Sequence, residues 1–266
     1  MLVPGQYQTK TPASFWRNAM PVKSVLSKIF LVGIIAFSQL TEAKQAQPTQ
    51  VIDVLSSNWK PFVYSENGVH KGFAYDIAKK VLDEANIGFN LYFFPWSRIY
   101  TLGVNKKNYL IVGLARTSKR EPLFHWIGPV AKPEAVYFYK LKKTAISLDK
   151  IPDAQRYVIA TEKFTHYHDF LEEQEFTFDN LLLVTRTEQI IKMLLNGRAD
   201  LILSTEQNFN SEAKRAGIDP ALFEKALPAY SVQEYMAFSG PTSADLYEKV
   251  QRSYHKFKNS GQLKLR

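Results

Sequence analysis

Cysteine is absent from the 266 residues of this chain. Its absence excludes disulfide bonds, zinc-thiolate sites and a cysteine nucleophile. The sequence also has no Ser-His-Asp order, no glycine-rich nucleotide loop and no helical HExxH motif. We therefore expect neither these kinds of enzyme site nor a bound cofactor. Export remains compatible with the composition, because a domain of about 220 residues can be stable on its apolar core alone.

Long apolar stretches are missing as well. The stretch Ile29–Phe37 reads IFLVGIIAF, whereas a membrane span needs about 20 residues. Lys23 and Lys28 precede it, and Thr41–Ala43 follows with a small residue at the cleavage position. This tripartite pattern predicts a secretory signal peptide over residues 1–43, with an uncleaved anchor as the alternative. The mature protein is then expected in the periplasm without a membrane span.

Two start sites fit this signal. Met1 is the first residue, but Met20 lies at a more usual distance from the apolar stretch. After the cleavage position, residues 44–50 are polar and contain Pro48, which indicates a flexible leader.

The charge is basic but dispersed. The formal net charge is +9, and the first 43 residues carry four Lys or Arg against one Glu. Six net positive charges remain in the mature part, where Lys and Arg are spread among Asp and Glu. Because no glycine-arginine tract or recognition helix accompanies them, we expect no nucleic-acid partner.

Hydrophobic periodicity predicts strands that alternate with helices. Residues 74–85 carry apolar side chains at spacings of three and four, as in an amphipathic helix. Further helices are expected near 95–102, at 188–196 before Gly197, and along 247–257. Apolar runs predict strands at 51–55, 89–94, 109–114, 136–141, 157–160 and 201–203. This alternation favours an α/β fold with mainly parallel pairing.

Several short motifs follow one another in a recognisable order. They are Trp59-Lys60-Pro61-Phe62, Gly72 to Ala78, the strand that leads into Trp96, Gly113 to Arg120, Phe124 to Pro129, and Leu195 to Asp200. The ordered set resembles the family 3 extracellular solute-binding proteins, whose members include polar amino-acid-binding proteins, over roughly residues 50–262. The resemblance implies the type II periplasmic binding protein fold, in which two lobes, each a central sheet flanked by helices, are joined by two crossing strands.

The resemblance also implies domain boundaries. Lobe 1 is expected at residues 50–137 plus 238–266, and lobe 2 at residues 138–237. The crossing strands would lie near 137–141 and 234–239. A ligand would bind between the lobes, which close by a hinge motion.

Three aromatic and cationic residues stand where this family holds its ligand. Arg120 matches the arginine that grips a ligand carboxylate, and a planar guanidinium offers two parallel donors to such a group. Trp59 and Trp96 match the positions whose rings sandwich the ligand side chain. A ring face attracts a cation and shields the site from water.

Three further residues complete the predicted site. Thr205 falls where the family keeps an aspartate for the ligand ammonium, and Glu206 beside it is the candidate substitute. Arg116 adds a cation near the site, which favours an acidic ligand. The pair His166 and His168 lacks a third ligand, so we expect no metal site.

These residues predict capture of a small polar or anionic solute, such as an amino acid or a related carboxylate. We expect a monomer without catalytic residues that delivers its ligand to an inner-membrane ABC permease or a sensor kinase. The main alternative is a periplasmic dehydratase on the same fold, with Glu206, Glu162 or His166 as general acid and Arg120 holding the carboxylate. A sensory module without transport is the third possibility.

Overall fold

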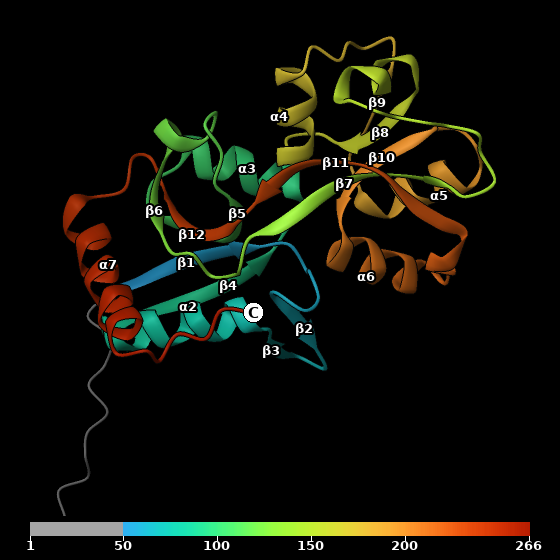
Figure 1. The fold of residues 1–266 in the computed structure, drawn as a ribbon. Helices are drawn as coiled ribbons and strands as arrows, with labels where there is room; N and C mark the ends of the chain where they lie inside the picture. The colour runs from blue at the N-terminus through green and yellow to red at the C-terminus, as the bar shows by residue number, and fades with distance from the viewer. Residues whose placement is uncertain (1–49) are drawn as a thin grey trace, which may run out of the picture. The chain divides into compact units, whose positions relative to one another are not determined.

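The structure, a computed structural model, describes residues 50–266 of the chain. The predicted signal peptide and almost all of the predicted leader lie outside the described residues. The described chain has two five-stranded sheets with helices packed against them (Figure 1), as the α/β prediction requires.

The first sheet has the strand order β4-β1-β5-β12-β6. Its strands are β1 (Gln50–Ser56), β4 (Ile87–Phe93), β5 (Tyr109–Ala115), β6 (Phe124–Ile127) and β12 (Glu234–Ser239). Its helices are α2 (Phe73–Glu84), α3 (Trp96–Asn105) and α7 (Ala244–Asn259). A two-stranded hairpin, β2 (Tyr64–Glu66) and β3 (Val69–Lys71), turns at Asn67-Gly68.

The second sheet has the order β11-β7-β10-β8-β9. Its strands are β7 (Glu134–Leu141), β8 (Ile159–Glu162), β9 (Leu181–Val184), β10 (Leu201–Thr205) and β11 (Phe223–Val232). Its helices are α4 (His166–Glu173), α5 (Ile190–Leu195) and α6 (Glu206–Ala216). Short 3₁₀ turns lie at Glu121–Leu123, Ile151–Arg156, Thr187–Gln189 and Pro220–Leu222.

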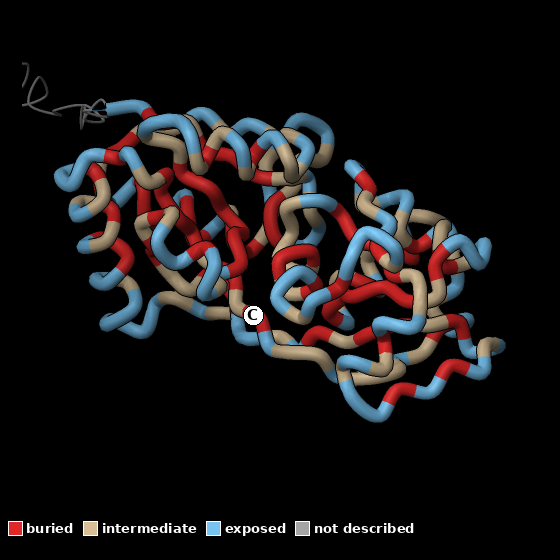
Figure 2. Tube along the Cα trace, turned by 90° about the horizontal axis from the view of Figure 1, so that it is seen from above, coloured by how far each residue is buried: buried red, intermediate tan, exposed pale blue. Residues whose placement is uncertain are grey.

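Alternation along the strands explains why each sheet is covered on both faces. Leu110 and Val112 of β5 belong to the apolar cluster that contains α2 and α7. Ile111, which lies between them, packs in the cluster that contains Ile99 of α3. Successive side chains of a strand point to opposite faces, so each central strand contributes to two cores. In Figure 2 the buried stretches run through the interior of each half of the described chain.

The pairing is mixed rather than mainly parallel, so that prediction was wrong. β1 is parallel to β4 and β5, whereas β12 is antiparallel to β5 and β6. In the second sheet, β10 is parallel to β8 but antiparallel to β7. The antiparallel strands β12 and β7 are those that the chain enters directly from the other sheet, so their direction does not come from a β-α-β crossover.

The chain changes sheet at two short segments. β7 pairs only within the second sheet and β12 only within the first. The changes therefore fall between β6 and β7, and at Gln233 between β11 and β12. The boundaries expected at 137–138 and 237–238 lie inside β7 and β12, a few residues further along the chain.

Candidate functional site

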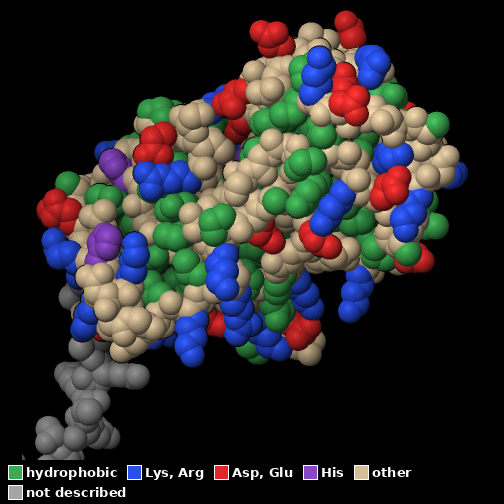
Figure 3. Space-filling view, viewed as in Figure 1, with side chains coloured by type: hydrophobic (Ala, Val, Ile, Leu, Met, Phe, Trp, Pro, Cys, Tyr) green, Lys and Arg blue, Asp and Glu red, His purple; other side chains and the backbone are tan. Residues whose placement is uncertain are grey.

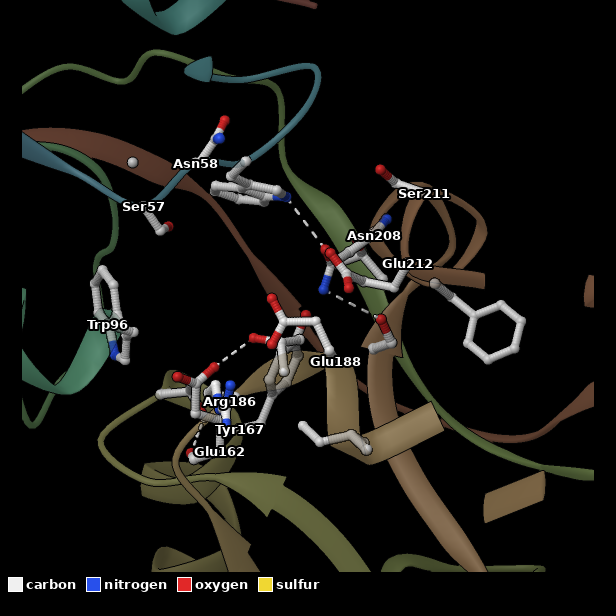
Figure 4. Close-up of a pocket in the computed structure, with 18 of the residues that line it drawn as sticks. Ser57, Asn58, Trp96, Glu162, Tyr167, Arg186, Glu188, Asn208, Ser211 and Glu212 are labelled. Carbon is white, nitrogen blue, oxygen red and sulfur yellow. Dashed lines mark hydrogen bonds between the residues drawn. The ribbon is translucent and has the colours of Figure 1, made fainter. Parts of the chain in front are cut away.

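A cavity of about 1000 Å³ is lined by residues from both sheets. The loop after β1 supplies Trp59 and the start of α3 supplies Trp96, while β10 and α6 of the second sheet's part supply Thr205 and Asn208. Figure 4 shows Trp96 and Asn58 from one side of this cavity and Tyr167, Glu188 and Asn208 from the other. Ligand pockets of proteins commonly have volumes of about 300–1000 Å³, so the cavity has room for a metabolite.

The loop after β1 positions Trp59. Backbone hydrogen bonds join Trp59 and Val63 in both directions, at 2.7 and 2.9 Å. The indole lies flat on Phe62, with ring centroids 3.8 Å apart. Gly72 allows this loop to approach the start of α2, because a Cβ there would lie 2.1 Å from the Phe62 carbonyl oxygen and its φ is +125°. The ring is therefore held rigidly at the cavity.

The indoles of Trp59 and Trp96 each donate a hydrogen bond to the part of the chain that forms the second sheet. Trp59 Nε1 donates to Asn208 Oδ1 of α6 at 3.1 Å. Trp96, the first residue of α3, donates from Nε1 to the Phe164 carbonyl oxygen at 2.6 Å. The two predicted aromatic residues thus both line the cavity, as the resemblance implies.

Arg120 lines the cavity, but each of its three side-chain nitrogens already has a partner in the protein. Arg120 is fully buried. Its guanidinium forms an ion pair with Asp169 of α4, in which Nη2 lies 2.8 Å from Oδ2 and Nε donates to Oδ2 at 2.9 Å. Nη2 also donates to the Phe164 carbonyl and Nη1 to that of Ala115. The structure therefore uses Arg120 to join α4 to the first sheet's part of the chain.

Two predicted site residues do not line the cavity. Arg116 forms a bidentate ion pair with Glu121 at 2.6 and 2.7 Å, next to the rings of Trp126 and Tyr235. Glu206, the first residue of α6, pairs with Lys225 at 2.7 Å. Neither is among the lining residues, so neither the extra cation nor the substitute carboxylate is where the sequence places it.

Thr205 is at the cavity but has a local role. It ends β10 and caps α6, since its hydroxyl accepts the backbone N–H of Asn208 at 3.2 Å. Threonine at this position satisfies one of the free N–H groups of the helix.

Five glutamates line the cavity, and sequence analysis selected only one of them, Glu162, as an alternative acid. Glu162 ends β8 and accepts a hydrogen bond from the Thr187 hydroxyl at 2.5 Å. Burial raises the pKa of Glu162 to about 7. Glu188 and Glu212 both pair with Arg215. Glu134 and Glu234 begin β7 and β12, and their position follows from strand pairing that the sequence alone does not specify.

Glu234 differs from the other lining glutamates. The residue is 6% exposed, and Oε2 is buried without a hydrogen-bond partner among residues 50–266. Burial raises the pKa of Glu234 to about 7, against the attraction of Arg120 and together with the repulsion of Glu134. Burial likewise raises the pKa of Glu134.

The two histidines of α4 differ in their surroundings. His166 lines the cavity, and its Nδ1 lies 2.7 Å from the Tyr230 hydroxyl. Burial and Arg120 lower the pKa of His166 well below its usual value, so the ring is neutral. His168, Asp169 and Glu172 have ligand atoms close enough for a metal ion, but Lys119 and Arg120 already contact those carboxylates.

The face of the molecule in Figure 3 shows acidic side chains among the basic ones. In the described part of the chain, no helix is long and apolar enough to cross a membrane.

Comparison with solved structures places the fold. A histidine kinase sensor domain with similarity to periplasmic binding proteins matches with a TM-score of 0.69 at 12% identity, over 82% of this chain and 93% of that one. Holo ArgBP from T. maritima matches with a TM-score of 0.64 at 16% identity, over 79% of this chain and 90% of that one. A structure described as a putative L-cystine ABC transporter from Listeria monocytogenes matches with a TM-score of 0.66 at 17% identity, over 81% of this chain and 93% of that one. These identities support the fold alone, and the fold is that of the type II periplasmic binding proteins.

Sequence comparison gives the family. Among curated proteins no sequence matches. The family described as bacterial extracellular solute-binding proteins, family 3, matches residues 52–265, nearly the whole described chain. The resemblance inferred from the ordered motifs is thereby confirmed, and the chain belongs to the family 3 bacterial extracellular solute-binding proteins.

Proposed function

We propose that this protein captures a small polar solute in the cavity lined by Trp59, Trp96, Thr205 and Asn208. The observation that carries the proposal is the cavity itself, about 1000 Å³ in volume and lined by both sheets' parts of the chain. Aromatic walls with a few convergent polar groups are typical of small-molecule sites. Family membership supports a binding role rather than a structural one.

The geometry favours binding over the dehydratase alternative. That reaction would need Arg120 to hold a substrate carboxylate, but Arg120 is paired with Asp169. Glu206, one of its three candidate acids, does not line the cavity. Glu162 and His166 do line it, so turnover of a cyclic hydroxy acid is the outcome that would favour the enzyme.

The role proposed for the loaded protein is delivery to an inner-membrane ABC permease in the periplasm, with a sensor kinase as the second partner. The two roles separate in cells. Deleting the gene abolishes uptake of the solute if the protein serves a permease. If it serves a kinase, uptake persists and the transcriptional response to the solute is lost.

Thermal unfolding with a library of amines, amino acids, organic acids and sugars tests capture. A ligand of the folded state adds RT ln(1 + [L]/Kd), about 2.7 kcal/mol at a hundredfold excess over Kd. We expect at least one class to raise the unfolding temperature and Trp59→Ala to reduce the rise. A library without any active compound would contradict the proposal.

A further inference from the structure

Two carboxylates enter the cavity from the two places where the chain changes sheet. Glu134 is the first residue of β7 and Glu234 the first residue of β12. Glu134 lies opposite Val232 of β11, and Glu234 lies opposite Ala115 of β5. Both line the cavity, and they are near enough for the charge of Glu134 to act on Glu234. Their backbone is held in ladders, so these positions are fixed by the fold.

Glu234 has no partner that would explain a buried carboxylate. It is 6% exposed, and no residue of the described chain hydrogen-bonds its buried Oε2. A buried carboxylate is costly unless it is paired or hydrogen-bonded. Since Glu234 lines the cavity, a ligand ammonium bound beside its carboxylate would supply the missing counter-charge.

Three cations that line the cavity, Lys60, Arg120 and Arg215, already form ion pairs within the protein. Arg120 influences Glu234 by its charge, but its N–H groups are directed at Asp169 and at two backbone carbonyls. Arg215 pairs with Glu188 and Glu212, and Lys60 pairs with Glu66. Arg186 and Lys214 also line the cavity and form no ion pair among residues 50–266, but they come from the segment after β9 and from α6, away from the strand starts that supply Glu134 and Glu234.

The aromatic walls suit a cation. Trp59 and Trp96 line the same cavity, and their polar Nε1 atoms are bonded to Asn208 and to the Phe164 carbonyl. With the N–H groups satisfied, what the indoles offer a ligand is ring surface, whose faces attract cations. The two carboxylates and the two indoles therefore favour a cation over an anion in their part of the lining.

We propose that the ligand is an organic amine cation without a carboxylate, with its ammonium held by Glu234 and Glu134 beside Trp59 and Trp96. The inference rests on the proposed solute capture and reverses the charge that the sequence predicts for the solute. An α-amino acid brings a carboxylate that needs cationic donors. Arg120 is engaged by Asp169 and two backbone carbonyls, and Arg116 is outside the cavity. Arg186 and Lys214 remain, on the part of the lining that does not carry Glu134 and Glu234.

Matched pairs of probes that differ by one carboxylate test this inference. Calorimetric titration compares cadaverine with lysine, agmatine with arginine, and histamine with histidine, and glutarate serves as the anionic probe. We expect an amine to bind tighter than its amino acid. Glu234→Gln and Glu134→Gln should each weaken amine binding by about tenfold or more, because each removes a charged hydrogen-bond acceptor. Glu248→Gln, which alters an exposed ion pair with Arg252, should leave it unchanged.

The measurements distinguish failure of the amine inference from failure of solute capture. Tighter binding of the amino acids or of glutarate overturns the inference and leaves solute capture standing, as does amine binding that both Gln variants leave unchanged. Failure of every compound in the wider library overturns capture and the inference together. Glu234→Gln replaces an unpaired buried charge and should fold, and the half-buried Glu134 gives a second variant should it not.

Discussion

Arg120 and Asp169 form a buried ion pair, 2.8 Å from Nη2 to Oδ2, between the segment after β5 and helix α4. Arg120 is fully buried and Asp169 is 5% exposed. The pair links the part of the chain that forms the first sheet to the part that forms the second. The arginine that sequence comparison assigns to a ligand carboxylate therefore has a protein carboxylate as its partner in this structure.

Removing the acid of this pair should destabilise the protein. Asp169→Asn leaves the Arg120 guanidinium buried without a counter-charge, and breaking a buried pair in this way costs about 3–5 kcal/mol. Denaturant unfolding measures the loss. Arg252→Gln, which breaks an exposed pair with Glu248, should cost less than about 1 kcal/mol. A cost that small for Asp169→Asn would mean that Arg120 is free to serve a ligand.

Glu234 should make the protein less stable as the pH rises. Its pKa is about 7 in the folded protein against an ordinary value of 4.5, so the folded state binds more protons between these values. Stability then falls as pH increases from about 4.5 to above 7, by up to about 3 kcal/mol for this group. Glu234→Gln should be more stable than the wild type at pH 8, with the difference vanishing near pH 4.5.

The wild type must be compared with Glu234→Gln because other groups titrate in the same pH range. Burial raises the pKa of Glu162 to about 7 and lowers that of His166. The raised pKa of Glu162 makes the protein less stable as pH rises. The lowered pKa of His166 makes it less stable as pH falls through the usual histidine range. Thermal unfolding of both proteins at a series of pH values isolates Glu234. Parallel curves would show that Glu234 keeps its ordinary pKa.

Amine affinity should increase with pH for the same reason. A cation binds the ionised form of Glu234, so cadaverine should bind tighter at pH 8 than at pH 6, and Glu234→Gln should flatten the dependence. The groups that act on Glu234 are Arg120 and Glu134. The phenols of Tyr167 and Tyr230 have raised pKa values and stay neutral in this range. Equal slopes for wild type and variant, measured by calorimetry, would assign the effect to another group.

Trp59 should contribute through its ring. Trp59→Leu removes a ring face worth about 0.5–2 kcal/mol to a bound cation, or roughly 2- to 30-fold in Kd. Trp59→Phe keeps an aromatic face and removes the Nε1 donor to Asn208. The Phe variant should therefore bind cadaverine tighter than the Leu variant. Equal losses in both would point to the Asn208 hydrogen bond instead.

Arg116 and Glu206 should be dispensable for binding. Each forms an ion pair with a residue of its own part of the chain, Glu121 and Lys225, and neither lines the cavity. Arg116→Gln and Glu206→Gln should change the Kd of the solute by less than about twofold, in line with the small energies of exposed pairs. A tenfold loss in either would restore the site expected from the sequence.

The fold was accessible from the sequence, because its main elements have clear local patterns. The helix predicted at 74–85 is α2 (Phe73–Glu84), and the helix expected before Gly197 is α5, followed by that glycine at φ +68°. Helix α6 was missed because Phe209 and Ala213 are its only buried residues, too few for a visible stripe. Its capping residue, Thr205, is predicted from the sequence as a ligand contact and also lines the cavity.

The site was accessible only in part. Trp59, Trp96, Arg120 and Thr205 all line the cavity, because the order of the motifs fixes which loops meet there. What the motifs cannot show is the partner of Arg120, since Asp169 lies 49 residues away in another part of the fold. Glu134 and Glu234 were also missed, because each starts a strand and no local motif surrounds it.

Tryptophan fluorescence tests most directly the central claim, that a solute occupies the cavity lined by Trp59 and Trp96. Trp59 and Trp96 both line it, so a bound solute changes their surroundings. The protein is titrated with the amines, amino acids and organic acids that raise its unfolding temperature. A saturable change that is lost in Trp59→Phe/Trp96→Phe is the predicted result. A ligand whose binding, measured by calorimetry, leaves the emission of these two residues unchanged would place the site elsewhere and contradict the account.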